Sequence, residues 1–177
     1  MIMQKYKIVF AGSMGAGKTE AIKSLSEVPV LATEVFNTDD QSHKKLNTTV
    51  GIDYGEVILD DGSKVGLYGT PGQGRFDFMW GVICKGAIGA ILLIDHSLDN
   101  SLDELSYYIK TFKQYSDNIV IGITHIDDDM NKSTHQYRQW LMDHRLDFPV
   151  FFMDARQKSD VLLLLETLIT SIEVKYL

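Results

Sequence analysis

Gly12-Ser13-Met14-Gly15-Ala16-Gly17-Lys18-Thr19 fits the pattern G-x-x-x-x-G-K-[ST] at every fixed position. A short apolar run, Tyr6–Ala11, precedes it, and Glu20–Leu25 follows with apolar residues at helical spacing. A strand, a glycine-rich loop and a helix start form a phosphate cradle, because backbone N–H groups turn inward at the positive end of the helix. Lys18 would reach the β- and γ-phosphates of a nucleotide, and the Thr19 hydroxyl would ligate Mg²⁺. We therefore expect a nucleotide site; the alternative is a glycine-rich turn that binds nothing.

The composition is that of a soluble globular protein. The 177 residues are 45% apolar and 23% charged, with a formal net charge of −7 at pH 7. This length and balance predict one domain, residues 1–177. An acidic chain lacks the basic surplus that neutralises phosphates, which argues against nucleic-acid binding. The single cysteine, Cys84, cannot form an internal disulfide, and we expect a cytoplasmic protein without a membrane anchor of its own.

Apolar strand-like runs alternate with helical patterns along most of the chain. The expected strands are Tyr6–Ala11, Tyr54–Leu59, Val65–Tyr68, Gly89–Asp95, Asn118–Thr124 and Phe148–Met153. The expected helices are Lys18–Ser26, Arg75–Lys85, Ser101–Tyr115, Lys132–Asp143 and Ser159–Tyr176. This alternation predicts an α/β fold: a doubly wound, mostly parallel six-stranded sheet with helices on both faces and ligands at the carboxyl ends of the strands. Asp60–Ser63 is typical of a hairpin turn, so one strand pair should be antiparallel.

Two further stretches resemble the small Ras-like GTPases. They are Thr48-Thr49-Val50-Gly51-Ile52-Asp53-Tyr54-Gly55 and the run from Gly69 to Trp80, which begins Gly-Thr-Pro-Gly-Gln. The resemblance covers nearly the whole chain and is nearest to the bacterial gliding-type (MglA-like) branch. It implies a P-loop NTPase of the small G-domain type that binds GTP and GDP with Mg²⁺ and hydrolyses GTP slowly unless an activating partner is present. It also implies a Roadblock-type partner and a role in bacterial polarity, motility or related signalling.

The resemblance assigns roles to two candidate switch segments. Thr49 matches a threonine that ligates Mg²⁺ and contacts the γ-phosphate, with the adjacent Thr48 as an alternative. Gly72 matches a glycine whose N–H approaches the γ-phosphate, and Gln73 matches a glutamine that orients the attacking water. The implied catalytic residues are Gln73 and Lys18, and the implied metal ligands are Thr19 and Thr49. The segment 28–47, which lacks periodicity, would be a mobile switch or a solvated insertion.

The base-binding motifs depart from the family pattern. Thr124-His125-Ile126-Asp127 stands where that pattern is Asn-Lys-x-Asp, so the Asn contribution is lost. The Asp127 carboxylate can accept hydrogen bonds from guanine N1–H and N2–H₂, which adenine lacks on that edge. Alternatively, Asp127 belongs to an acidic, solvated helix start. Asp154-Ala155-Arg156 stands for Ser-Ala-Lys, and the Ala155 N–H would bond guanine O6. The expected nucleotide-binding residues are Gly12, Ser13, Met14, Gly15, Ala16, Gly17, Lys18, Thr19, Glu20, Thr49, Gly72, Thr124, His125, Asp127, Asp154, Ala155 and Arg156.

Gly69 stands where most Ras-like proteins carry an aspartate that holds Mg²⁺ through a water. The glycine predicts weaker metal binding or a substitute carboxylate elsewhere. Together with Thr124, it supports a second hypothesis, a binding module that presents a surface without hydrolysing GTP. A third hypothesis, a P-loop kinase for a small metabolite, needs an arginine-rich lid, whereas the arginines of this chain are scattered. ATP stays an alternative to GTP at this stage because Thr124 and His125 replace Asn and Lys.

Overall fold

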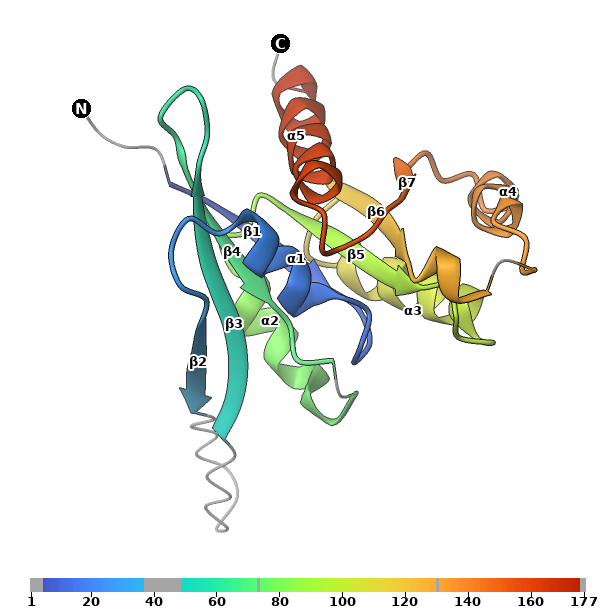
Figure 1. Cartoon of the computed structure of the whole chain (residues 1–177), viewed down its shortest axis with the longest axis horizontal. Helices are drawn as coiled ribbons and strands as arrows, with labels where there is room; N and C mark the ends of the chain where they lie inside the picture. The colour runs from blue at the N-terminus through green and yellow to red at the C-terminus, as the bar shows by residue number, and fades with distance from the viewer. Residues whose placement is uncertain (1–4, 37–48, 73, 130, 176–177) are drawn as a thin grey trace.

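A seven-stranded sheet organises the chain (Figure 1). The structure, a computed structural model, describes residues 5–36, 49–72, 74–129 and 131–175. Their strands are β1 (Lys5–Ala11), β2 (Leu31–Phe36), β3 (Thr49–Ile58), β4 (Lys64–Gly69), β5 (Gly89–Asp95), β6 (Ile119–Thr124) and β7 (Val150–Phe152), in the order β2-β3-β4-β1-β5-β6-β7. Their α-helices are α1 (Lys18–Leu25), α2 (Trp80–Cys84), α3 (Ser101–Phe112), α4 (His135–Asp143) and α5 (Lys158–Lys175), and their 3₁₀ helices are η1 (Gly74–Met79) and η2 (Ile126–Asp129).

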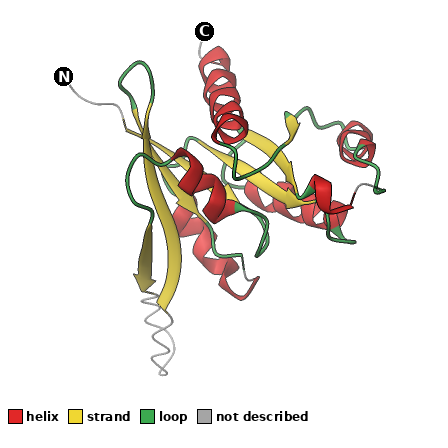
Figure 2. Ribbon diagram, in the orientation of Figure 1, coloured by secondary structure: helices red, strands yellow, loops and turns green. Residues whose placement is uncertain are grey.

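Helices cover both faces of the sheet (Figure 2). The apolar sides of α1 and α5 pack on one face, and those of α2, α3 and α4 pack on the other. Every residue of β5 and β6 is buried, which agrees with their continuous apolar sequences and with the helices above and below them. The predicted α/β class and doubly wound, mostly parallel sheet are therefore confirmed.

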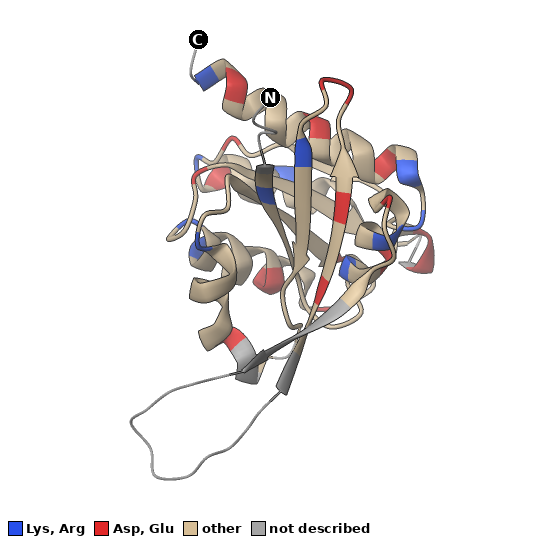
Figure 3. Cartoon of the chain, turned by 90° about the vertical axis from the view of Figure 1, so that its left-hand side faces the viewer, with Lys and Arg blue, Asp and Glu red and all other residues tan. Residues whose placement is uncertain are grey.

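The sheet has one strand more than the six that the sequence predicts. Leu31–Phe36, inside the segment expected to lack regular structure, forms β2 and pairs antiparallel with β3, Leu31 opposite Tyr54 and Phe36 opposite Thr49. The sequence of this edge strand has no strong local strand pattern, and turn-forming residues follow it, so it was not predicted. The strand forms because its backbone pairs with β3. Figure 3 views the molecule from this edge. The predicted hairpin between β3 and β4 is confirmed as an antiparallel pair, with Asp60 and Asp61 in its turn.

The predicted helix over Arg75–Lys85 is instead two shorter pieces, η1 and α2. Glycine and aromatic residues are poor helix formers, and they occupy much of this segment. The predicted helix at Lys132 starts three residues later, at His135. The other helix ends lie within a few residues of their predicted positions. Among the described residues, no helix combines the length and apolarity needed to cross a bilayer.

Candidate functional site

The glycine-rich loop joins β1 to α1 at the carboxyl end of the central strands, and its glycines are structurally required. Gly12 has φ +152°, and a Cβ atom there would lie 2.3 Å from the carbonyl oxygen of Leu93. Gly17 has φ +104°, and a Cβ atom there would lie 2.9 Å from the Cβ of Ala155. Left-handed backbone and close packing together exclude a side chain at both positions. The loop is therefore pressed against β5 and against the segment after β7.

Lys18 is held inside this loop. Its side chain is buried, 8% exposed, and its Nζ donates hydrogen bonds to the carbonyl oxygens of Gly12 at 2.6 Å and Ser13 at 2.7 Å. Burial lowers the pKa of Lys18 to about 8, although the carboxylates of Asp53 and Glu104 oppose this shift. A desolvated ammonium group gains more than an exposed one from an anion placed beside it. Lys18 therefore has the setting of a phosphate-binding lysine.

Thr19, the next residue, contacts a carboxylate that sequence reasoning did not assign to the site. Its hydroxyl donates a hydrogen bond to Oδ2 of Asp53 on β3. A hydroxyl and a carboxylate are hard oxygen ligands of the kind Mg²⁺ prefers, and Mg²⁺ commonly takes one or two such groups and completes its shell with phosphates and waters. The donor set at this place therefore fits the expected metal. Gly69 was the available signal, because it predicts either weaker metal binding or a substitute carboxylate elsewhere.

Gly72, from the candidate second switch, lies directly against the phosphate loop. A Cβ atom on Gly72 would lie 2.5 Å from the backbone nitrogen of Met14 and 2.9 Å from Nζ of Lys18. The predicted proximity of this glycine to the phosphate site is thus present in the fold. Gln73 and Thr48 lie outside the described residues. Thr49 opens β3, and only its backbone is described.

A cavity of about 620 Å³ lies beside the phosphate loop. Residues from four separate segments line it: the loop and α1, the end of β6 with η2, the end of β7, and the start of α5. Among the predicted nucleotide-binding residues, those in its wall are Gly15, Gly17, Glu20, Thr124, His125, Asp127, Asp154, Ala155 and Arg156. The wall also includes Ile126, Asp128, Phe152, Met153 and Asp160, which the sequence did not single out. The fold therefore gathers both altered base-binding motifs around one space next to the phosphate loop.

Thr124 ties β6 to the phosphate loop. Its buried hydroxyl lies 2.9 Å from the carbonyl oxygen of Ala16 and 3.3 Å from that of Ile94. A threonine hydroxyl can donate to a backbone carbonyl, so Thr124 links the base-binding motif to the phosphate loop. The expected loss of the asparagine contribution to base binding stays a prediction. The exchange keeps the two halves of the site joined.

His125 makes a second link between the two halves. Its backbone has φ +56°, its Nε2 lies 2.9 Å from the carbonyl oxygen of Gly15, and its Nδ1 lies 3.0 Å from Oδ2 of Asp128. Both neighbours are acceptors, so both ring nitrogens must donate, which requires the imidazolium form. Burial lowers the pKa of His125, but the Gly15 carbonyl and the carboxylates of Asp95 and Asp128 outweigh it, and the pKa is raised overall. The surroundings of the ring therefore favour its charged form at the place of the family lysine.

The remaining predicted residues differ in their setting. Asp127 is exposed on η2 and faces the cavity. Ala155 is 7% exposed, with its methyl group against Gly17. The carboxylate of Asp154 accepts hydrogen bonds from the backbone N–H and the guanidinium of Arg156, which lower the pKa of Asp154 to about 2. Arg156 is thus engaged by its own neighbour, and Asp154 is a carboxylate that orders the loop.

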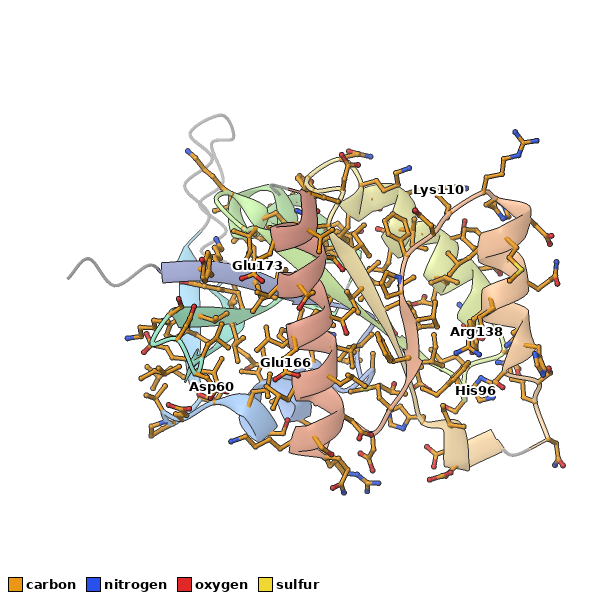
Figure 4. All side chains as sticks on the ribbon, turned by 90° about the horizontal axis from the view of Figure 1, so that it is seen from above. Asp60, His96, Lys110, Arg138, Glu166 and Glu173 are labelled. Carbon is orange, nitrogen blue, oxygen red and sulfur yellow. The ribbon has the colours of Figure 1, made fainter. Side chains whose placement is uncertain are left out.

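A buried polar network connects the end of β5 with α3 and α4. Nδ1 of His96 lies 2.7 Å from the hydroxyl of Tyr137, and this hydroxyl lies 3.0 Å from Oγ of Ser101. Nζ of Lys132 donates to the His96 carbonyl at 2.8 Å and to Ser101 Oγ at 2.9 Å. In Figure 4, His96 lies beside α4, the helix that carries Arg138. This network could not be predicted from a local pattern, since His96 and Tyr137 are 41 residues apart along the chain.

Comparison with known proteins identifies a family to which this chain is similar. The Ras family model matches residues 7–173. The Ras-related protein Rab-8B of Bos taurus is 27% identical over 160 residues, which are 88% of this chain and 72% of the relative. The GTP-binding protein ypt3 of Schizosaccharomyces pombe is 24% identical over 175 residues, 94% and 75% of the two chains. The uncharacterized protein MJ1339 of Methanocaldococcus jannaschii is 32% identical over 97 residues, 55% of each chain. The predicted resemblance is therefore confirmed at the level of the family, whereas its gliding-type branch stays a prediction.

Proposed function

Since the chain belongs to the Ras family, we propose that it is a molecular switch, a single G domain that binds GTP and GDP with Mg²⁺ and hydrolyses GTP slowly. The observation that carries the proposal is the cavity of about 620 Å³ beside the phosphate loop, whose wall brings Asp127 and Ala155 together with Gly15 and Gly17. A purine base seated there would have its phosphates on the loop that holds Lys18. The site thus has one part for a base and one for a polyphosphate.

Each part of the site has a defined task in this proposal. Asp127 accepts the two hydrogen bonds that guanine offers on its N1 and N2 edge, and the Ala155 N–H bonds guanine O6. Lys18 and the loop N–H groups bind the β- and γ-phosphates and stabilise the charge that develops during phosphoryl transfer. Gly72 approaches the γ-phosphate, so that segment senses whether the third phosphate is present.

Thr19 and Thr49 are the residues that would hold Mg²⁺. When bound, the metal neutralises charge on the β- and γ-phosphates. The Thr19 hydroxyl already lies beside the carboxylate of Asp53, an oxygen donor suited to that ion. By resemblance, Thr49 would be the second ligand when a triphosphate is bound.

Nucleotide binding by the purified protein tests the function itself. Nucleotide-free protein is titrated with fluorescent GDP and fluorescent ADP, with and without Mg²⁺. We expect strong preference for the guanine nucleotide and slower release with the metal. Equal affinity for ADP would overturn the assignment of Asp127, and binding of neither nucleotide would overturn the proposal as a whole.

Replacement of Gln73 by Ala is expected to slow GTP hydrolysis by about tenfold or more, because the side chain is proposed to orient the attacking water. The measurement is single-turnover phosphate release from bound GTP, with GDP affinity as the control, which should stay within about twofold. Should both proteins release phosphate at the same near-zero rate with a cognate activator present, the second candidate function, a non-hydrolysing binding module, would be favoured. Gly69 and Thr124 are the features that support that alternative.

Binding of GDP is expected to weaken about two- to fivefold between about pH 6 and about pH 8.5, because His125 loses its charge. The pKa of His125 is raised above its ordinary value of 6.5, so its charged contacts are complete below that value and are lost as the pH rises through the raised pKa. The effect is modest since the side chain is 38% exposed and a solvated ion pair contributes up to about 1 kcal/mol. The measurement is the Kd for fluorescent GDP across this range.

A His125→Lys variant is the matched control for this pH dependence. Lysine keeps its charge throughout the range, so the His125 contribution should vanish while the titration of the nucleotide phosphates remains. Identical pH profiles for the two proteins would contradict the role of His125.

We also propose that a protein partner reads the switch at η1 and α2. Phe78 and Val82 are exposed there, at 53% and 62%, and Tyr107 of α3 is exposed at 45%. Aromatic and aliphatic side chains of this kind are typical anchors of protein interfaces. By resemblance the partner is of the Roadblock type, the process is bacterial polarity, motility or related signalling, and the location is the cytoplasm. The single cysteine, Cys84, is buried and suits that location.

A further inference from the structure

Asp53 on β3 lies next to Gly69 on the neighbouring strand, β4. The antiparallel register of β3 and β4 pairs Tyr54 with Tyr68. Asp53 precedes Tyr54 and Gly69 follows Tyr68, so the two residues lie side by side just beyond the last pair of this register. A Cβ atom built on Gly69 would lie 3.3 Å from Cβ of Asp53 and 3.7 Å from its Oδ2. The space that a side chain at position 69 would enter is therefore already bordered by the Asp53 carboxylate.

This carboxylate also touches the phosphate site. Oδ2 of Asp53 accepts the hydrogen bond from the Thr19 hydroxyl. Asp53 thus directly contacts the residue that is expected to ligate the metal, at the start of the helix that follows the phosphate loop.

We propose that Asp53 supplies the negative charge beside the Mg²⁺ site that the chain lacks at Gly69, and that it positions the Thr19 hydroxyl as a metal ligand. This inference rests on the proposed function. The carboxylate is thus on β3 instead of β4, and it borders the space that a side chain at position 69 would enter. Asp53 is a positioning residue in this account, since it acts through Thr19 and through the charge that it adds.

The chemistry of the Thr19 hydroxyl supports this role. A hydroxyl that donates a hydrogen bond to a carboxylate keeps its lone pairs free for a cation. The negative charge of the hydrogen-bonded carboxylate also strengthens the interaction between the hydroxyl oxygen and the cation. Removal of such outer groups lowers metal affinity by about 10- to 100-fold in known metal sites. A purely structural link between β3 and α1 would affect folding and would leave metal affinity unchanged.

The test is the Mg²⁺ dependence of fluorescent GDP release from the wild-type protein and an Asp53→Asn variant. Asparagine keeps the size and a hydrogen-bond acceptor but removes the charge. The free Mg²⁺ concentration that gives half of the maximal slowing should rise by about tenfold or more, while release in excess EDTA stays within about twofold. Asp60→Asn is the control, because it removes the same charge from the exposed β3–β4 turn and should behave as wild type (Figure 4).

A double variant, Asp53→Ala with Gly69→Asp, places a carboxylate on the other strand. The new side chain would meet Cδ1 of Ile22 at 3.1 Å, the movable end of a flexible residue. We expect it to recover most of the Mg²⁺ affinity lost in Asp53→Ala alone. An unchanged Mg²⁺ requirement in Asp53→Asn, with GDP still bound, would overturn this inference and leave the proposed function intact. A wild-type protein that binds no guanine nucleotide would overturn both.

Discussion

Replacing Lys18 with Ala is expected to lower the affinity for GDP and GTP by about 100-fold or more. The Lys18 ammonium is buried inside the phosphate loop, where it donates to two backbone carbonyls within 2.7 Å. Removing one partner of a buried charged pair costs about 3–5 kcal/mol, and each 1.4 kcal/mol corresponds to a factor of ten in Kd. The measurement is the Kd for fluorescent GDP by equilibrium titration, with circular dichroism to verify that the variant is folded.

Lys23→Ala is the matched control for this experiment. Lys23 lies on the same helix as Lys18, but its side chain is 55% exposed and pairs with Glu20 at 3.3 Å. Loss of an exposed cation changes affinity by little, because solvent screens it. If Lys18→Ala bound GDP as tightly as Lys23→Ala, the loop could not be a phosphate site, and the account of this protein as a nucleotide switch would have to be abandoned.

The phosphate loop could be predicted from sequence because its requirements are local. Glycines at Gly12 and Gly17 are demanded by backbone geometry, and the lysine and threonine follow at fixed spacing. The buried strands β5 and β6 were predictable for the same reason, since their apolar residues run without interruption. Short-range patterns of this type report directly on local structure.

Features that depend on distant partners were not predicted. β2 forms because its backbone pairs with β3. Asp53 joins the site because the separate pairing of β3 with β4 brings it next to Gly69. The link between Thr124 and Ala16 joins residues 108 positions apart. The absence of an aspartate at position 69 and of an asparagine at position 124 is visible in the sequence. The contacts that Asp53 and Thr124 make instead are visible only in the folded structure. Departures from a family motif are therefore best read together with the residues that face them in space.

Two residues that depart from the family motif, Thr124 and His125, both connect the base-binding loop to the phosphate loop. Thr124 and His125 each bond a carbonyl oxygen of the phosphate loop, those of Ala16 and Gly15 respectively. The base-binding loop is thus attached to the phosphate loop at two adjacent points. This attachment explains how a chain with neither Asn nor Lys in the motif keeps its two half-sites in one place. In the proposed function, base recognition is the task of Asp127, which makes no comparable structural hydrogen bond among the described contacts.

An Asp127→Asn variant is therefore expected to lose about 100-fold or more in affinity for GDP and to gain binding of the xanthine nucleotide XDP. The Asp127 carboxylate accepts both guanine donors in the proposed complex, whereas an asparagine offers one acceptor and one donor. Xanthine presents N1–H and a carbonyl at C2, which match that pair. A site that leaves a buried polar group unpaired rejects its ligand by two or more orders of magnitude, so the preference should reverse.

Asp128→Asn provides the contrast that makes this result interpretable. Asp128 is also exposed and also lines the cavity, but its carboxylate bonds Nδ1 of His125, so its loss should weaken GDP and XDP binding alike and only a few-fold. Competition of fluorescent GDP with unlabelled GDP, XDP and ADP in both variants separates base reading from loop support. If Asp127→Asn and Asp128→Asn gave the same modest loss with no gain of XDP, Asp127 would belong to the solvated helix start instead, and guanine would have to be read by another group. The same titrations therefore test both carboxylates, because a change of base preference is expected only for Asp127→Asn.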